Sequence, residues 1–209
     1  NVGVSNYGPS LLRRAHSFLA ARGVPLASNQ INYSLLGFRL SHPITSHTIS
    51  AVPGRRIERA CPRRSAQPTL DACRELDVSV LGYFPLANGL LAGKYSATSM
   101  PKGLKSQTMR KYVVGGVTER GVTYPAGGIE PLLVELRAVA EARDKTVAQV
   151  SLNYCIAKGV VPIPGCRNVQ QAEDNARAIG WELESAEIER LEAAADALGF
   201  EFNSGFKLE

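Results

Sequence analysis

The apolar positions of the chain fall into short runs that alternate with longer stretches of helical periodicity. Strands are predicted at residues 2–4, 26–31, 78–83 and 160–163. The last, with Val160, Val161 and Ile163, is wholly apolar, as is typical of a strand buried on both faces of a parallel sheet. Between them, apolar residues recur every three or four positions, which predicts helices. The predicted helices cover residues 9–22, 69–76, 130–142, 146–157 and 169–178, and a last one is capped by Ser185.

This alternation of strand and helix predicts an α/β fold with a parallel sheet and helices outside it. The segment lengths fit four successive units of a (β/α)8 barrel followed by a C-terminal helix, that is, a partial TIM barrel. A flavodoxin-like or Rossmann sheet is the competing topology, and the absence of GxGxxG after any strand counts against the Rossmann alternative.

Helix-start signals support several of these boundaries. Pro9 suits the first position of a helix, and Thr146 and Asn168 are good N-caps. The third residue after Ser185 is Ile188, so no capping box is expected there. The end of the second strand carries Asn29 and Gln30. Polar groups at the end of a buried strand are costly unless they bind something.

The stretch from residue 160 to residue 175 is the most informative part of the sequence. A short strand leads into Gly165 and Arg167, and Asn168 begins a helix. A helix N-terminus offers free N–H groups and a positive dipole end, and an arginine fork there can grip a phosphate. The stretch therefore predicts a dinucleotide phosphate site, although an ordinary strand–helix connection with a solvated arginine has the same pattern.

Three segments lack a regular period and are expected to be loops. Residues 37–69 form a basic, proline-containing insertion, residues 85–94 are glycine-rich, and residues 96–128 are long and polar enough to form a lid. The insertion holds six arginines against one glutamate between residues 37 and 70, a surplus of +5 that equals the net charge of the whole chain, +5. The remainder is therefore neutral, and no nucleic-acid partner is expected.

The composition of the 209-residue chain, 44% hydrophobic and 21% charged, is that of a globular protein with one core. No apolar run is long enough for a membrane span, and no signal peptide precedes the first strand. The chain does not begin with Met, which suggests a fragment or a processed product. Its four cysteines form no CxxC pair and no metal site with the histidines, and Cys73 and Cys155 are expected in the core. These features predict a soluble protein of a reducing compartment.

Four motifs in this order resemble the aldo-keto reductases, and most closely the plant and algal, often plastid-targeted, branch. They are Gly-Val-Ser-Asn-Tyr at 3–7, Asn-Gln-Ile-Asn-Tyr at 29–33, Gly-Tyr-Phe-Pro-Leu-Ala at 82–87 with Gly-Leu-Leu-Ala-Gly-Lys-Tyr at 89–95, and Ile-Pro-Gly-Cys-Arg-Asn at 163–168 with Gln171 and Asp174-Asn175. The resemblance covers most of the chain apart from about residues 37–69. It implies strands 5–8 of the barrel, the C-terminal half of an NADPH-dependent enzyme that reduces aldehydes or ketones to alcohols.

The resemblance also implies roles for individual residues around bound NADP(H). Ser5, Asn6 and Gln30 match the side chains that hold the nicotinamide carboxamide, and Tyr83 matches the aromatic residue that stacks on the ring. Other positions match the pyrophosphate loop, the 2′-phosphate pocket and the adenine contacts. They are Leu86, Gly89, Leu91, Gly93 and Lys94 for the loop, Gly165, Cys166, Arg167 and Gln171 for the pocket, and Asp174 and Asn175 for the adenine.

The sequence also departs from the family pattern. Phe84 stands where a serine is usual, and Cys166 replaces a common hydroxyl or alanine, so two contacts to the phosphates are weaker. The catalytic Asp, Tyr, Lys and His of the family belong to the first half of the barrel, and no residue here takes those roles. Residues 37–69 are longer than the family's loop and helix. They represent either a partner-binding loop or a gene-model error such as a retained intron, and the lack of any motif favours the error.

Two functions are therefore open: the cofactor-binding half of a reductase, or a non-catalytic NADP-binding remnant that serves as a structural or interaction subunit. Four parallel strands cannot close a barrel, so two edges stay open and an inner face is uncovered. The isolated chain is therefore expected to be marginally stable, to aggregate, or to self-associate through its open edges and complete a barrel. A plastid or the cytoplasm is the expected location.

Overall fold

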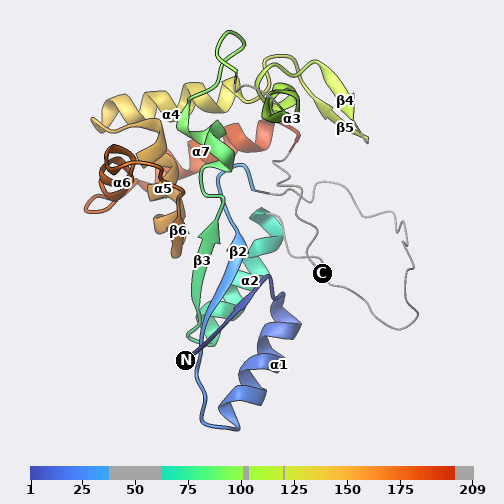
Figure 1. Ribbon diagram of the computed structural model, residues 1–209, viewed down its shortest axis with the longest axis vertical. Helices are drawn as coiled ribbons and strands as arrows, with labels where there is room; N and C mark the ends of the chain where they lie inside the picture. Colours follow the sequence, from blue (N-terminus) through green and yellow to red (C-terminus); the bar gives the residue numbers. More distant parts are fainter. Residues whose placement is uncertain (38–62, 101–103, 120, 201–209) are drawn as a thin grey trace.

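The computed structural model describes residues 1–37, 63–100, 104–119 and 121–200. Strands and helices alternate along it (Figure 1). In chain order the elements are β1 (Val2–Ser5), α1 (Pro9–Ala20), β2 (Leu26–Asn32), α2 (Arg63–Glu75), β3 (Ser79–Tyr83), the 3-10 helix η1 (Ala87–Ala92), α3 (Leu104–Val113), β4 (Val117–Glu119), β5 (Val122–Tyr124), α4 (Glu130–Ala142), α5 (Val147–Ala157), β6 (Val160–Ile163), α6 (Val169–Ala176) and α7 (Ser185–Ala197).

A four-stranded parallel sheet in the order β1-β2-β3-β6 forms the centre of the fold. Figure 1 shows α1 and α2 running along the strands, whereas α4, α5, α6 and α7 gather towards one end of them. The α/β class and the parallel sheet predicted from the sequence are confirmed. All four predicted strands are present, and α4 has the predicted bounds.

Helix starts were predicted well at α1, α5 and α6, but not at α7. Pro9 occupies the first turn of α1, and the Thr146 and Asn168 side chains accept from the amides of Gln149 and Gln171. The N-cap of α7 is Glu184 rather than Ser185, and the Glu184 amide donates to the Glu187 carboxylate at 2.8 Å. The capping-box contact that the sequence excluded is therefore present, because the box is counted from Glu184.

Helix α2 begins within the stretch expected to be a loop. It starts at Arg63, so Pro68 lies inside it instead of preceding it. Proline costs a helix one backbone hydrogen bond, and the complete burial of Ala72 and Cys73 further along the helix offsets that cost. Residues 38–62, which make up most of the predicted basic insertion, lie outside the described residues.

The segment expected to be a lid, residues 96–128, contains α3 and an antiparallel hairpin of β4 and β5. Its core is aromatic. The Tyr112 and Tyr124 ring centroids lie 5.3 Å apart, and the Phe200 ring lies 5.1 Å from Tyr124. The sequence missed this unit because its strands are short and the three rings that pack in its core are far apart in the chain.

The two faces of the main sheet differ in burial. One row across the sheet joins Asn29, Val80 and Val160, all buried under the helices. The next row joins Gln30, Leu81 and Val161, and Val161 is 55% exposed. The sequence predicted that β6 is buried on both faces, and this is wrong. Strand β6 is at the sheet edge, and on the second face Ile163 is also 43% exposed.

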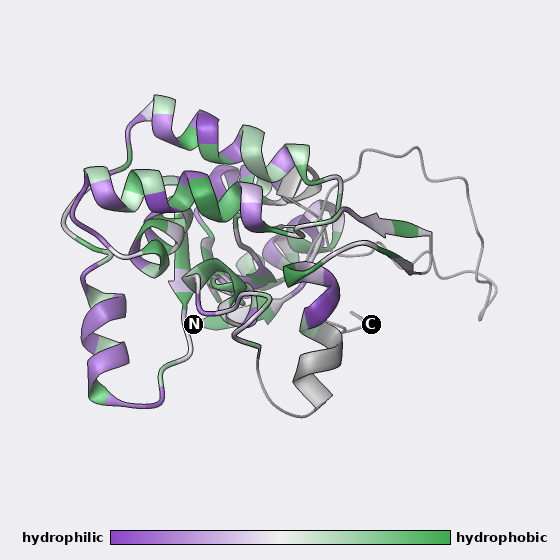
Figure 2. Cartoon of the chain, turned by 90° about the horizontal axis from the view of Figure 1, so that it is seen from above, coloured by the Kyte–Doolittle hydropathy of each residue, from purple (hydrophilic) through white to green (hydrophobic). Residues whose placement is uncertain are grey.

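The hydrophobic core lies between the helices and the face of the sheet that carries Val80 and Val160. Figure 2 shows hydrophobic residues gathered in the middle of the molecule and hydrophilic residues on the outer turns of the helices. Cys73 and Cys155 are fully buried in this core, as predicted. Burial raises the pKa of the Cys155 thiol to about 12, so this thiol is protonated and inert at neutral pH.

Candidate active site

The parallel sheet brings the carboxyl ends of its four strands to the same end of the molecule. Tyr83 at the end of β3 pairs with Asn32 of β2 on one side and with Ile163 of β6 on the other. Ser5 at the end of β1 pairs with Gln30. Because all the predicted site segments begin at or just after these ends, the topology places them at one end of the sheet.

Three predicted nicotinamide contacts meet between β1 and β2. The Ser5 hydroxyl donates to the Gln30 carbonyl at 3.3 Å, and the Asn6 side-chain amide donates to the Ser5 hydroxyl at 3.0 Å. The Asn6 main-chain N–H also donates to the Gln30 carbonyl, at 2.8 Å. Asn6 has a φ of 61°, a left-handed conformation that asparagine tolerates better than most residues. Within the described chain, the Gln30 side-chain amide has no hydrogen-bond partner and remains able to bind a ligand.

Asn29 holds this turn in place from inside the protein. It is fully buried, its side-chain oxygen accepts from the Tyr7 N–H at 3.3 Å, and its side-chain nitrogen donates to the Tyr7 carbonyl at 2.9 Å. The sequence had marked Asn29 as a polar residue that must bind something, but not its partner. That partner is the backbone immediately after Ser5 and Asn6.

Tyr83 closes the same cluster from β3. Its hydroxyl donates to the Asn6 side-chain oxygen at 3.0 Å, and its ring is half-buried. Burial raises the pKa of Tyr83, an effect that the Asn6 hydrogen bond partly opposes, so the phenol is protonated at neutral pH. The Phe84 ring meets the Tyr83 ring edge-on, with centroids 5.5 Å apart.

The predicted pyrophosphate loop is the short helix η1. Leu86 precedes it, Gly93 ends it with a φ of 64°, and Leu91 is fully buried beneath it. Ala87, Asn88 and Gly89 all have positive φ. Consecutive residues with positive φ are strained, so the surrounding structure must hold this backbone conformation in place. Lys94 follows at the surface.

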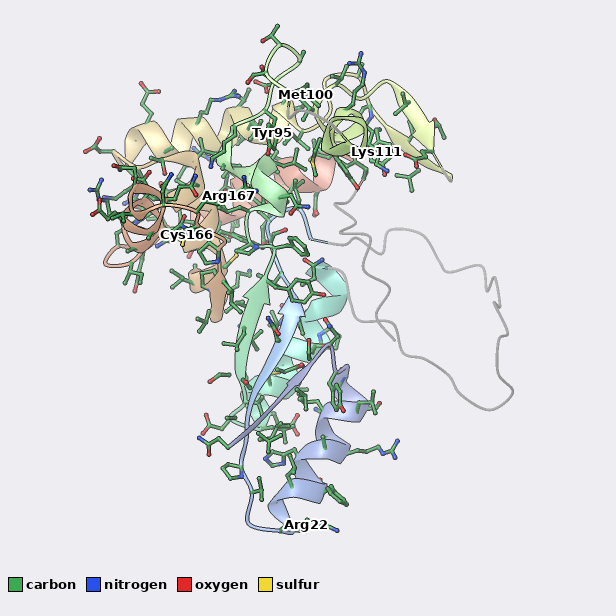
Figure 3. All side chains as sticks on the ribbon, viewed as in Figure 1. Arg22, Tyr95, Met100, Lys111, Cys166 and Arg167 are labelled. Atoms are coloured by element: carbon green, nitrogen blue, oxygen red, sulfur yellow. The ribbon has the colours of Figure 1, made fainter. Side chains whose placement is uncertain are left out.

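The turn between β6 and α6 carries the predicted 2′-phosphate residues, and Figure 3 labels Cys166 and Arg167 there. The Arg167 N–H donates to the Gln171 side-chain oxygen at 2.9 Å, so these two residues are brought together. Gly165 does not have a left-handed φ, and a Cβ there would touch nothing, so the turn does not itself require glycine. That open space would let a ligand approach the backbone closely.

The predicted adenine contacts lie further along α6. The Asp174 carboxylate lies 3.8 Å from the guanidinium of Arg177 on the same helix, and Asn175 is half-buried beside it. Helix α5 packs against both η1 and α6, and so connects the two predicted phosphate-side segments.

The residues present fit a dinucleotide. Amide and hydroxyl groups converge at the end of β1 and β2, and a half-buried aromatic ring adjoins them. Two exposed cations follow, Lys94 just after η1 and Arg167 in the turn before α6. In the part of the chain that the structure describes, neither Lys94 nor Arg167 has a carboxylate partner, so both are available to an anion.

A family model supplies the decisive comparison. The model of the Aldo/keto reductase family matches residues 1–196. The chain belongs to the aldo/keto reductase family.

Two curated members of the family illustrate the relationship. The chloroplastic pyridoxal reductase of Arabidopsis thaliana is 38% identical over 194 residues, which cover 93% of this chain and 43% of that protein. The NADP(+) aldo-keto reductase yakc of Schizosaccharomyces pombe is 24% identical over 198 residues, which cover 93% of this chain and 48% of that protein. The chain therefore spans about half the length of the curated relatives it matches.

Solved structures of aldo-keto reductases have the same fold. The aldo-keto reductase of the silkworm Bombyx mori in complex with NADP superposes with a TM-score of 0.51 at 17% identity, over 92% of this chain and 43% of that one. At this identity the similarity is one of fold alone. Among the described residues, no helix is both long and apolar enough to cross a membrane.

Proposed function

We propose that this chain is the cofactor-binding half of an NADPH-dependent aldo-keto reductase that reduces an aldehyde or ketone to an alcohol. The observation that carries the proposal is the cluster of Ser5, Asn6, Gln30 and Tyr83 at the carboxyl ends of three adjacent strands. When bound, NADPH supplies the hydride. The chain's own residues supply binding and orientation.

Each group in the cluster has a distinct task. The Gln30 amide and the unused hydrogen-bonding positions of Asn6 would hold the carboxamide of a nicotinamide ring, and this contact selects the ring face that is presented to the substrate. The Tyr83 ring would cover the other face and exclude water from it. Arg167 and Lys94 would bind phosphate groups as exposed cations.

The proton donor of such a reduction is proposed to come from outside this chain. The chain spans 43% to 48% of the two relatives described above, and the family resemblance assigns the catalytic Asp, Tyr, Lys and His to the preceding half-barrel. The substrate is a small carbonyl compound, and pyridoxal is the first to test because the Arabidopsis relative is a pyridoxal reductase. The same relative is chloroplastic, which favours the plastid over the cytoplasm for this chain.

A fluorescence titration with NADPH and NADH tests the cofactor assignment. We expect tighter binding of NADPH, and Arg167→Ala should reduce this preference by at least roughly tenfold because one charged hydrogen bond to phosphate contributes about 1.5–3 kcal/mol. Arg22→Ala is the matched control, since Arg22 lies at the opposite end of the molecule (Figure 3), stacked on Phe18. Equal affinities for the two cofactors, or an equal loss in both variants, would contradict the proposal.

A second candidate function is that of a non-catalytic NADP-binding remnant or interaction subunit. Val161 and Ile163, exposed on the uncovered face of the sheet, would give such a subunit an apolar surface for binding a partner. The upstream coding sequence separates the candidates. A Tyr and a Lys in the expected preceding strands support the reductase, whereas a start codon next to Asn1 supports the subunit.

A further inference from the structure

Helix α5 has three polar side chains buried in succession on alternate positions. Gln149, Ser151 and Asn153 are 4%, 0% and 1% exposed. A polar group is buried at a cost unless it is hydrogen-bonded, so the identity of its partner is informative. Each of the three bonds to the backbone of a different segment.

Ser151 connects α5 to η1. Its hydroxyl lies 2.8 Å from the Leu91 carbonyl, 60 residues away in the chain, and 2.9 Å from the Val147 carbonyl one turn earlier in α5. Leu91 is the fully buried residue of the predicted pyrophosphate loop. Val147 also lies beneath Gly93, where an added Cβ would be 3.7 Å from its side chain.

Gln149 connects α5 to α6. Its side-chain nitrogen donates to the Asp174 carbonyl at 3.0 Å, while its side-chain oxygen accepts from the Thr146 N–H at 3.0 Å. Asp174 lies in the predicted adenine segment. One side chain thus caps its own helix and holds a neighbouring one.

We infer that Ser151 and Gln149 are positioning residues that fix the separation of the two segments binding the cofactor's phosphates and adenosine. This inference rests on the proposed function. The two side chains lie two residues apart on one helix, so α5 holds η1 and α6 at a fixed separation. A bound dinucleotide must place its pyrophosphate and its adenine at the two segments at once, and a preset separation lowers the ordering cost of binding it.

Three single variants separate this role from general stability. Ser151→Ala removes the hydroxyl that holds η1. Gln149→Glu keeps an oxygen for the Thr146 cap but loses the donor to Asp174. Asn153→Ala is the matched control: Asn153 is buried on the same helix but bonds Ala178, Trp181 and Leu183, which lie outside the proposed site.

Hydrogen exchange without cofactor gives the first measurement. Ser151→Ala should raise amide exchange in residues 86–93, Gln149→Glu in residues 169–176, and Asn153→Ala only in residues 178–183. The same exchange in all three variants as in the wild type, or a uniform rise across the chain, overturns the inference whatever the chain binds.

The affinities for NADPH and for adenosine 2′,5′-bisphosphate are the second measurement. Because one neutral hydrogen bond is lost, we expect Ser151→Ala to weaken NADPH roughly fivefold and to leave the bisphosphate unchanged. Gln149→Glu should weaken the binding of both ligands. Asn153→Ala should weaken the binding of neither, although this variant should melt at a lower temperature than the wild type. Failure of the wild type to bind NADPH overturns the proposed function; wild-type binding with unchanged affinities in Ser151→Ala and Gln149→Glu overturns this inference alone.

Discussion

At the scale of single residues, Tyr83 combines two roles that a substitution can separate. Its ring forms one wall of the cluster at the strand ends, and its hydroxyl donates to the Asn6 side chain at 3.0 Å. That hydrogen bond, with the one from the Asn6 amide nitrogen to Ser5, holds the Asn6 side chain in place. The orientation of Asn6 towards a ligand therefore depends on a residue 77 positions away in the chain.

Tyr83→Phe keeps the ring and removes only the hydroxyl. We expect NADPH affinity to fall roughly fivefold, because about 1 kcal/mol of hydrogen bonding that fixes Asn6 is lost. Tyr83→Ala should lose more, since the stacking surface is removed as well. A titration by cofactor fluorescence measures both, and equal affinities for the phenylalanine and tyrosine forms would exclude a role for the hydroxyl.

Sequence reasoning at this scale located residues but not their partners. Ser5, Asn6, Gln30 and Tyr83 were placed by motif at strand ends, where the structure brings them together. The two hydrogen bonds between the Asn29 side chain and the Tyr7 backbone could not be predicted, because they depend on the register between β1 and β2. Ser151 gave no signal at all, since a serine in an apolar helix does not reveal which segment packs above it.

At the scale of elements, the junction between α3, the hairpin and α4 depends on one of two adjacent glycines. Gly115 and Gly116 both have positive φ, 67° and 72°. A Cβ on Gly115 would lie 1.6 Å from the Pro125 carbonyl oxygen, whereas a Cβ on Gly116 would meet nothing within 4 Å. Space, and not conformation alone, distinguishes the two positions.

Gly115→Ala should therefore destabilise the chain by more than about 3 kcal/mol, because the backbone of residue 125 must move. Gly116→Ala should cost only about 1 kcal/mol, the penalty of a left-handed alanine. Urea unfolding followed by circular dichroism gives both values, and similar midpoints for the two variants would show that the junction is not packed as described.

An ion-pair cluster joins α4 to the start of α7. The Arg143 guanidinium donates to both oxygens of Glu187, at 2.9 and 2.8 Å, and to Glu184 at 2.6 Å. Hydrogen bonds from Arg143 lower the pKa of Glu187, although burial partly opposes this.

The lowered pKa gives a pH dependence with a definite sign. Glu187 holds its proton less tightly in the folded chain, so its contribution to the free energy of unfolding is present at neutral pH and is lost as the pH falls through the folded-state pKa. Glu187→Gln should lower the urea midpoint at pH 7, and the difference from wild type should shrink below about pH 4. A difference that is constant over this range would mean that the charge contributes nothing.

Local signals predicted most elements because they repeat along the chain. The apolar spacing of α4 and the caps at Thr146 and Asn168 are short-range features, and they were placed well. The hairpin and the start of α2 were missed, because distant packing decides them: the Tyr112, Tyr124 and Phe200 rings in one case, and the burial that overrides Pro68 in the other.

At the scale of the whole molecule, the uncovered face of the sheet predicts association. Val161 and Ile163 are 55% and 43% exposed there, and burying the remaining exposed surface of each would contribute roughly 1 kcal/mol. We expect the isolated chain to sediment as a dimer or a larger species, and Val161→Lys with Ile163→Lys to weaken that association more than roughly tenfold.

Val134→Lys is the control for this experiment, because Val134 is 52% exposed on the outer side of α4 and lies away from the sheet. It should leave the sedimentation profile unchanged. A wild-type chain that runs as a monodisperse monomer and melts in one sharp transition would contradict the prediction.

The parallel arrangement of the sheet followed from the alternation of strand and helix, since such connections leave few other topologies. The uncovered inner face also followed, since four parallel strands cannot close a barrel. An apolar run, however, has the same composition whether or not a neighbour covers it. Val161 and Ile163 were therefore predicted to be buried on residue type alone.

The proline in the middle of β6 limits what any such association can become. Pro162 pairs with Gly82 in a strand at the edge of the sheet, where a residue without an N–H is tolerated. An incoming strand would find a donor missing in the centre of a four-residue edge, too short and too interrupted to template unlimited growth. Oligomers of this chain should therefore dissociate on dilution and fail to bind amyloid dyes, because the β6 edge cannot seed a fibril.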